Sequence, residues 1–329
     1  MKKLFALMLA LTLIVSLAAC SGSGQGGENA SNQTEAPTEP AVLHISDDTD
    51  VLDMSITPPE DYVSVKRTLD RHADTGAVIE KNLAYTFSDG SVLTFATSCE
   101  NEENQAEYII ENIGEDKTEK REIGSKTFYV FEYGSELYAI NQTDDVAYGI
   151  RYQFSEDSSD SSTESTEEKK SSEIFDKALE SVSFTDNKTT EENEEGLGDI
   201  KYSLDDSLNV VSVYDELEET KDGEMVRKSY TWRIGKDKDN IDFRLLVRVI
   251  KNAKIEDELN DDYTYSEKTS YERDYTVREV DGNDCEYYYQ KGDDVYIIKN
   301  LGNNTGWSVN RSEESYQALD ALMQTVSFD

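Results

Sequence analysis

The sequence contains few histidines, cysteines and prolines, and it is poor in positive charge. Among 329 residues there are 2 His, 3 Cys and 4 Pro, and 32 Lys plus Arg stand against 70 Asp plus Glu, which gives a formal net charge of −38. Nucleic-acid binding depends on clustered cations that neutralise phosphates, so this charge argues against a nucleic-acid partner. It also argues against a basic patch that binds anionic lipids. The length predicts two domains of about 150 residues each.

The scarcity of histidine restricts the chemistry that the chain can perform. Only His44 and His72 are present, and there is no G-x-S-x-G motif. A Ser-His-acid or Cys-His arrangement needs a histidine placed against a nucleophile, and zinc sites prefer His and Cys ligands. We interpret both histidines as surface residues. We therefore expect a protein that is not an enzyme and that has no cofactor and no metal site.

The cysteines give no sign of redox chemistry. Apart from Cys20, only Cys99 and Cys285 occur, and no C-x-x-C pair is present, so a thioredoxin-like site or a zinc ribbon has no support. In an exported protein, the oxidising compartment would permit a disulfide bond between Cys99 and Cys285, and such a bond would join the two expected domains. We favour two separate, mostly buried thiols on strands, which behave as small apolar side chains.

The N-terminal residues carry the most specific motif. Lys2 and Lys3 precede an apolar run, Leu4–Leu17, that is shorter than the roughly 20 residues needed to span a bilayer but suits a secretory signal. The following Leu17-Ala18-Ala19-Cys20 resembles the lipobox of bacterial lipoproteins, in which the cysteine receives a diacylglyceryl group and becomes the new N-terminus. The resemblance implies a signal peptide at residues 1–19, a lipidated Cys20 and a location on the extracytoplasmic face of the cell membrane.

Residues 20–41 have the composition of a tether. They are rich in Gly, Ser and other polar residues and cannot bury enough apolar surface to offset the entropy of ordering. A coil of this length has an end-to-end distance on the order of 25 Å. We therefore expect a disordered, lipidated tether that holds a soluble folded part away from the membrane.

A pattern that occurs twice dominates the rest of the chain. In each copy two strand-like segments flank a turn with a glycine, which predicts a β-hairpin. The matched residues, all at one constant offset, are Gly124 and Gly282, Tyr129 and Tyr287, Gly134 and Gly292, Tyr138 and Tyr296, and Ile140 and Ile298.

Each copy also ends in the same way. Residues 174–184 and 318–328 place apolar side chains at i, i+1, i+4, i+5 and i+8, which predicts a helix packed on a sheet, followed by a short extended Val-Ser-Phe. The offset is shorter here, which indicates an insertion in the first copy. The acidic, Ser-rich residues 155–171 contain no apolar side chain and are expected to form this insertion as a disordered loop.

The earlier part of each copy predicts strands followed by a partly helical stretch, at residues 104–113 and 253–262. The order of strands, helix, strands and helix favours an antiparallel α+β sheet over a doubly wound parallel one. The acidic residues 186–199 have the composition of a linker. The expected organisation is therefore a first α+β domain at 42–185, the linker at 186–199 and a second α+β domain at 200–329.

This layout resembles the PsbP-like α/β/α sandwich. The similarity rests on the segment Pro58-Pro59-Glu60-Asp61-Tyr62 after an early strand, on the hairpin, and on the terminal helix that leads into Val-Ser-Phe. The second copy lacks the double proline. The resemblance implies two tandem PsbP-like domains that act as non-catalytic accessory or binding modules, and it carries over no catalytic residue.

Acidic pairs and tyrosines are the remaining candidates for a site. Pairs such as Asp144-Asp145 fit no EF-hand spacing and are expected on solvated surfaces, with weak divalent-cation binding as an alternative. Tyrosine, with 20 copies, is favoured at binding surfaces. We therefore identify Tyr287, Tyr288 and Tyr289 as a possible contact surface, although alternation along a strand would direct part of this run into the core.

These observations lead to three hypotheses about function. The first is a membrane-anchored extracytoplasmic lipoprotein that is a non-catalytic binding or accessory module for a protein or envelope polymer. A basic protein partner would be attracted by the net charge, with binding that weakens as salt rises. The alternative is a cell-envelope hydrolase that uses a carboxylate pair. A solute-binding protein would need two larger lobes with parallel sheets, which the order of strands and helices does not supply.

Overall fold

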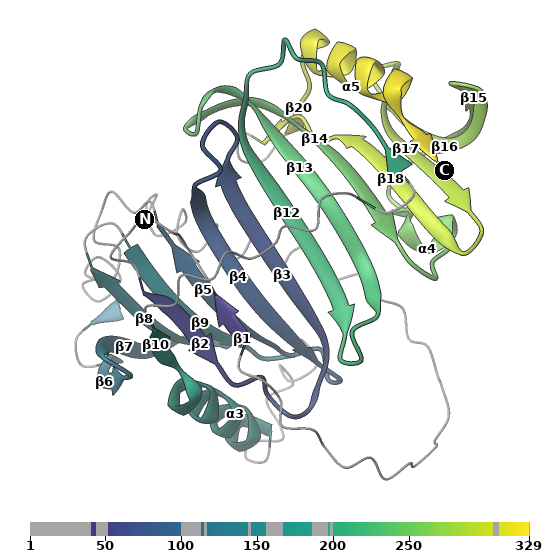
Figure 1. Cartoon of the computed structure of the whole chain (residues 1–329). Helices are drawn as coiled ribbons and strands as arrows, with labels where there is room; N and C mark the ends of the chain where they lie inside the picture. The colour runs from purple at the N-terminus through teal and green to yellow at the C-terminus, as the bar shows by residue number, and fades with distance from the viewer. Residues whose placement is uncertain are drawn as a thin grey trace, which may run out of the picture. The chain divides into compact units, whose positions relative to one another are not determined.

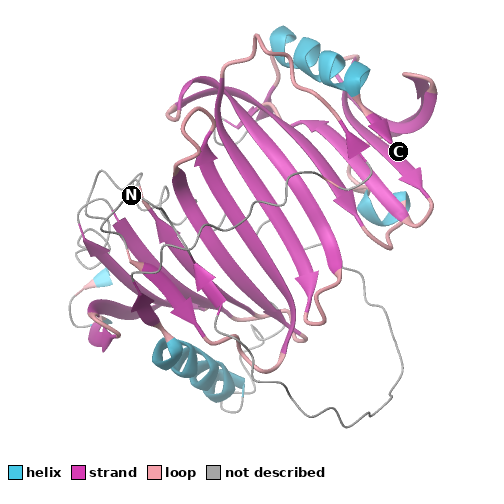
Figure 2. Cartoon of the chain, viewed as in Figure 1, coloured by secondary structure: helices cyan, strands magenta, loops and turns pink. Residues whose placement is uncertain are grey.

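The computed structural model describes residues 41–43, 52–99, 113–114, 117–143, 146–155, 167–185, 197, 200–304 and 309–328. Two compact units form (Figure 1): unit 1 contains Met1–Leu43, Val51–Asp61 and Asp89–Asn187, and unit 2 contains His44–Asp50, Tyr62–Ser88 and Lys188–Asp329. Strands make up most of the described structure and helices little of it (Figure 2). Within the described ranges, every helix is too short or too polar to cross a lipid bilayer.

Unit 1 is built on an antiparallel sheet. Its strands run in the order β5 (Val92–Ser98), β9 (Val146–Gln153), β8 (Glu136–Thr143), β7 (Lys126–Tyr133) and β6 (Glu119–Ile123). A small second sheet joins β1 (Ala41–Leu43), β2 (Asp53–Ile56) and β10 (Ser183–Thr185). Helix α3 (Glu167–Ser181) packs against β9 and β2, and it buries Phe175, Ala178 and Leu179, which lie on one side at helical spacing.

Unit 2 contains a longer antiparallel sheet. Its strands run in the order β15 (Tyr265–Ser270), β16 (Arg273–Val280), β17 (Asn283–Lys291), β18 (Asp294–Asn300), β14 (Asn240–Ile250), β13 (Met225–Asp237), β12 (Val210–Thr220), β3 (Tyr62–His72) and β4 (Val78–Phe87). Two short pairs are added: β11 (Ile200–Lys201) with β21 (Ser327–Phe328), and β19 (Asn303–Asn304) with β20 (Val309–Asn310). The helices are the one-turn α4 (Ile255–Glu258) and α5 (Glu313–Thr325).

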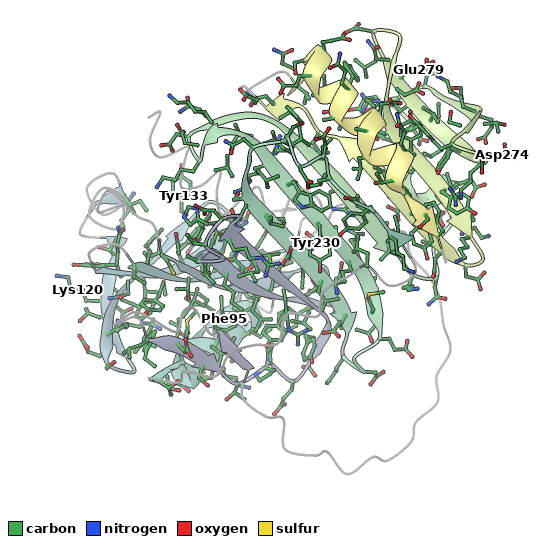
Figure 3. The ribbon with its side chains drawn as sticks, turned by 45° about the horizontal axis from the view of Figure 1, so that its top comes forward. Phe95, Lys120, Tyr133, Tyr230, Asp274 and Glu279 are labelled. Carbon is green, nitrogen blue, oxygen red and sulfur yellow. The ribbon has the colours of Figure 1, made fainter. Side chains whose placement is uncertain are left out.

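Helix α5 covers one face of this sheet and closes the main core of unit 2. Leu322 and Met323 of α5 are fully buried in a cluster that also contains Tyr230 and Trp232 of β13. Tyr230 is labelled among the side chains in Figure 3. The Ser312 hydroxyl accepts a hydrogen bond from the Ser315 N–H at 3.2 Å, so the helix begins at a serine cap.

The expected hairpins and terminal helices are confirmed. Strands β7 and β8 form one antiparallel hairpin and β17 and β18 the other. The turn glycines Gly134 and Gly292 have φ of 65° and 62°, a left-handed conformation that glycine adopts without strain. Helices α3 and α5 each lead into a short extended end, β10 and β21. The antiparallel arrangement is also confirmed, but the chain is richer in strand than the α+β description implies.

Three details differ from the expectations. Residues 167–171, expected in a disordered insertion, form the first turns of α3. The stretch 253–262 contains only the single turn α4, because its acidic residues offer little apolar surface for a longer helix to bury. Most of 104–113 lies outside the described residues. In unit 1, β9 lies between β8 and β5, whereas in unit 2 the strand that corresponds to β8, which is β18, pairs directly with β14. Part of the extra length of the first copy is therefore an additional strand, β9.

The boundary between the units also differs from the expected domains. Strands β3 and β4 fall within the expected first domain, 42–185, but β3 pairs with β12 along most of its length. Opposite charges meet at this pairing, where the Arg71 guanidinium lies 2.9 Å from the Asp215 carboxylate. The earlier hairpin β3–β4 therefore belongs to unit 2.

Candidate functional site

The sheet of unit 2 has one face that is largely polar. Residues directly opposite each other on paired strands share a face, and the register aligns Thr68 of β3, Glu216 of β12, Ser229 of β13 and Arg248 of β14. This row lies opposite the apolar face that α5 covers. We call it, with the residues that alternate with it on the same side, the charged face. Its defining residues are Lys66, Asp70, Glu80, Glu216, Arg227, Arg248, Arg278, Glu286 and Lys299.

A first group on this face surrounds Glu216, and we call Lys66, Glu216, Arg227 and Arg248 the Glu216 cluster. The Lys66 Nζ lies 4.0 Å from Glu216 Oε2, and Arg248 Nη2 lies 3.7 Å from Glu216 Oε1. The side chain of Glu216 is only 3% exposed and that of Arg248 only 10%. Ser229 of β13 lies between Glu216 and Arg248. Because the serine side chain is short, Arg248 can reach across β13 toward Glu216.

Burial and mutual repulsion act on the cations of this cluster. Burial lowers the pKa of Lys66; Glu216 and Glu218 oppose the shift, while Arg227 and Arg248 add to it. Burial likewise lowers the pKa of Arg248, against the attraction of Glu216. Within the described part of the chain, the buried atoms Glu216 Oε1, Arg227 Nε and Arg248 Nε have no hydrogen-bond partner. The cluster therefore retains two arginine donors and one carboxylate acceptor that its own residues do not satisfy.

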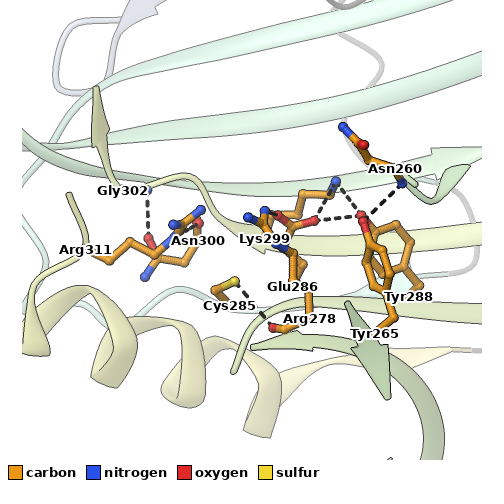
Figure 4. A network of polar contacts seen from close by, with 10 residues as sticks. All are labelled: Asn260, Tyr265, Arg278, Cys285, Glu286, Tyr288, Lys299, Asn300, Gly302 and Arg311. Carbon is orange, nitrogen blue, oxygen red and sulfur yellow. Dashed lines mark hydrogen bonds and ion pairs between the residues drawn. The ribbon is translucent and has the colours of Figure 1, made fainter. Parts of the chain in front are cut away.

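A second group, which we call the Glu286 cluster, consists of Arg278, Glu286, Tyr288 and Lys299 and is joined by hydrogen bonds and ion pairs (Figure 4). The Glu286 carboxylate accepts from Arg278 and from the Tyr288 hydroxyl at 2.7 Å, and Lys299 Nζ lies 3.0 Å away. Lys299 also donates to the Tyr288 hydroxyl at 2.7 Å. Burial alone would raise the pKa of Glu286, but Lys299, Tyr288 and Arg278 outweigh it and lower that pKa. Such a network of paired charges stabilises the sheet.

A third group contains two carboxylates. Asp70 of β3 and Glu80 of β4 are directly opposite each other. Arg233 donates to Asp70, and Asn82 Nδ2 donates to Glu80 Oε1 at 2.7 Å. Burial raises the pKa of Asp70 against the effect of Arg233. Burial also raises the pKa of Glu80, where Asn82 opposes the shift and Asp70 adds to it. Burial thus makes both acids harder to ionise than an exposed carboxyl group.

The predicted contact surface of three tyrosines is wrong for two of them. Tyr287 is 4% and Tyr288 1% exposed, so neither can form a surface. Strand β17 lies inside the sheet, and the two side chains point to opposite faces: Tyr287 into the core under α5 and Tyr288 into a smaller apolar cluster near α4. Tyr289 is half-buried, and its ring lies 4.4 Å from that of Phe328.

The other predicted residues have varied outcomes. Cys20 and His44 lie outside the described residues, and His72 is half-buried at the end of β3. Cys99 and Cys285 are both free thiols, in agreement with two separate cysteines. The Cys285 thiol is buried and donates to the Arg278 carbonyl at 3.4 Å, and burial raises its pKa. Across the described ranges, no three His, Cys, Asp or Glu side chains gather in a way that could hold a metal ion.

The sequence reasoning missed the charged face. Its signal is present as alternate polar residues in long strands, such as Lys66, Thr68 and Asp70 in β3. That alternation is also the pattern of any strand with one side in solvent, so burial of the polar side could not be read from it. No protein-family model matches the sequence, and no curated protein or solved structure is significantly similar to it.

Proposed function

We propose that this chain is a membrane-anchored, extracytoplasmic lipoprotein whose folded part is a non-catalytic binding or accessory module. The leader Leu17-Ala18-Ala19-Cys20 supports the anchor. The proposal treats the two hairpin-and-helix patterns as tandem PsbP-like copies. A diacylated cysteine buries two acyl chains, which holds a protein at a membrane where a single chain holds it only marginally.

The observation that carries the binding role is the charged face of unit 2. Helix α5 packs on one face of the sheet, while the opposite face carries Lys66, Glu216 and Arg248. On this face, within the described residues, the buried Nε atoms of Arg227 and Arg248 have no hydrogen-bond partner. Buried polar groups that serve only stability are normally hydrogen-bonded. A ligand that supplies the missing hydrogen-bond partners would account for these unpaired groups on the charged face.

Metabolic labelling tests the anchor. The full chain and its Cys20→Ala variant would be produced in a bacterium that is fed an alkyne-tagged fatty acid. We expect the label on the wild-type chain at the membrane and no label on the variant. A wild-type chain without label, or a variant that still carries it, would contradict the anchor.

A second candidate function is a cell-envelope hydrolase, and the Asp70–Glu80 pair favours it. Retaining glycosidases hold their two carboxyl groups about 5–5.5 Å apart. Asp70 and Glu80 are directly opposite each other on paired strands, where Cβ atoms lie about 4.5–5.5 Å apart, so their carboxyl groups can reach a common substrate. Purified wild-type chain would be incubated with cell-wall polysaccharide, and release of reducing ends would be measured. Release that disappears in both Asp70→Asn and Glu80→Gln variants would establish this activity in place of the binding role.

A further inference from the structure

We propose that the Glu216 cluster is a binding site for a phosphate group, either free phosphate or a phosphate monoester. The inference deepens the proposed binding function, on which it rests, by naming the chemical class of the ligand. It starts from charge. Lys66 and Arg248 lie 4.0 Å and 3.7 Å from Glu216. Arg227, directly opposite Glu218 on the next strand, acts electrostatically on both of these cations, and Glu218 acts on Lys66. Three cations therefore meet three carboxylates, Glu216, Glu218 and Glu258, in a chain whose acids outnumber its cations by 70 to 32, so cations are locally concentrated here.

The orphaned donors point to the same kind of ligand. Arg248 as a whole residue is 8% exposed, and its Nε is buried without a hydrogen-bond partner in the described part of the chain. The buried Nε of Arg227, opposite Glu218 on the next strand, is in the same situation. A buried cation without full pairing destabilises the folded state, and an arriving anion would remove that cost.

Phosphate suits these donors better than carboxylate does. It carries about −1.5 to −2 charge at neutral pH and offers three or more acceptor oxygens, whereas a carboxylate offers two oxygens and a single charge. Arginine forks bind phosphate oxygens in pairs, and a lysine adds a point charge. A polymer with many phosphates would be repelled by the net charge of −38, so a single phosphate group is the better match.

The test is a titration of the full chain, purified in detergent, with inorganic phosphate. Isothermal calorimetry would measure affinity, and broadening of the phosphate ³¹P resonance would report binding directly. Glycerol phosphate would distinguish a monoester from the free ion, and acetate would test a plain carboxylate. The variants are Arg248→Met and, as a matched control on the same strand and face but outside the cluster, Arg244→Met.

We expect saturable phosphate binding by wild-type and Arg244→Met chains and at least a tenfold weaker affinity in Arg248→Met. Should Arg248→Met fail to fold, Arg248→Lys keeps the charge and removes the Nε donor, and it should still bind several-fold more weakly than the wild type. Absence of binding by wild type, equal binding of acetate, or an unchanged affinity in the Arg248 variants would overturn the proposal. Fatty-acid labelling of Cys20 does not depend on this site, so the anchor and the phosphate site fail separately.

Discussion

At the scale of single residues, Asp215 shows how burial and pairing compete. Its carboxylate lies 2.9 Å from Arg71, yet burial outweighs this attraction and raises its pKa to about 6. An acid whose folded pKa exceeds its unfolded pKa of about 4 costs stability once it ionises. The cost is absent below about pH 4, grows as the pH rises to about 6, and is complete above that value.

Because ionisation of Asp215 costs stability, Asp215→Asn is predicted to stabilise the folded state above about pH 4. The variant cannot ionise, so its free energy of unfolding should rise relative to wild type by about 2–3 kcal/mol between pH 4 and pH 7, since each pKa unit is worth about 1.4 kcal/mol. Urea unfolding at several pH values would measure the difference. Asp206→Asn, at an exposed position, is the control and should show no such trend. A flat difference for Asp215→Asn would show that its carboxylate ionises normally.

Glu286 is the opposite case, a buried carboxylate whose negative charge balances the neighbouring cations Arg278 and Lys299. Glu286→Gln would leave Arg278 and Lys299 buried without their counter-charge, and removal of one partner from such a group costs about 3–5 kcal/mol. The matched control is Glu279→Gln, because Glu279 is 43% exposed where it pairs with Lys268, and an exposed pair is worth about 1 kcal/mol or less. Equal losses in urea unfolding for the two variants would contradict a structural role for the Glu286 cluster.

At the scale of elements, two glycines are needed for different reasons. A Cβ at Gly235 of β13 would lie 2.2 Å from the Asn240 carbonyl oxygen, so alanine would force the β13–β14 hairpin apart. Gly292, in the β17–β18 turn, has φ of 62° and open space around it, so alanine there would meet only backbone strain. We expect a loss of about 3 kcal/mol for Gly235→Ala and about 1 kcal/mol for Gly292→Ala in urea unfolding. The reverse order would show that the hairpin can relax around the added methyl group.

Elements whose signals are local could be predicted from the sequence. The hairpins β7–β8 and β17–β18 were marked by a glycine between alternating apolar residues, and α3 and α5 by an apolar stripe within about a dozen residues. The register of a hairpin and the position of a helix depend on residues that are close together in the sequence. Local patterns are therefore sufficient to predict these elements. The extension of α3 into a polar segment was not predictable in this way, because residues 167–171 carry no apolar signal.

Elements fixed by distant partners could not be predicted. Nothing near β3 in the sequence states that it pairs with β12, which lies about 150 residues further on. The candidate site depends on this pairing, since Lys66 and Glu216 come together only through it. The same limit explains Tyr287 and Tyr288: a strand rich in tyrosine looks the same whether it lies at an edge or inside a sheet, and only the neighbouring strands bury it.

At the scale of the whole molecule, two strands from distant parts of the sequence meet through opposite charges. Strand β3 supplies Lys66, Arg67 and Arg71, while β12 supplies acidic partners and no cation. Oppositely charged residues across paired strands stabilise the pairing, and like charges oppose it. The acidic strand β12 is therefore stabilised specifically by pairing with β3. The segment 200–329, which the sequence predicted to be a complete domain, does not contain β3.

This reasoning predicts the behaviour of fragments. Residues 200–329 alone would leave the edge of β12 open, with Asp215 and Glu216 facing no cation from β3, so this fragment should unfold or associate. The same fragment fused through a long Gly/Ser linker to residues 62–88 regains β3 and β4 and should fold, with a cooperative urea transition. A fusion that carries Lys66→Glu and Arg71→Glu is the control and should behave like the fragment without β3, because the repulsion it creates opposes pairing with β12. Size-exclusion chromatography and circular dichroism would distinguish these states. A stable, monomeric 200–329 fragment would show that the first hairpin is an addition to unit 2 that its fold does not require.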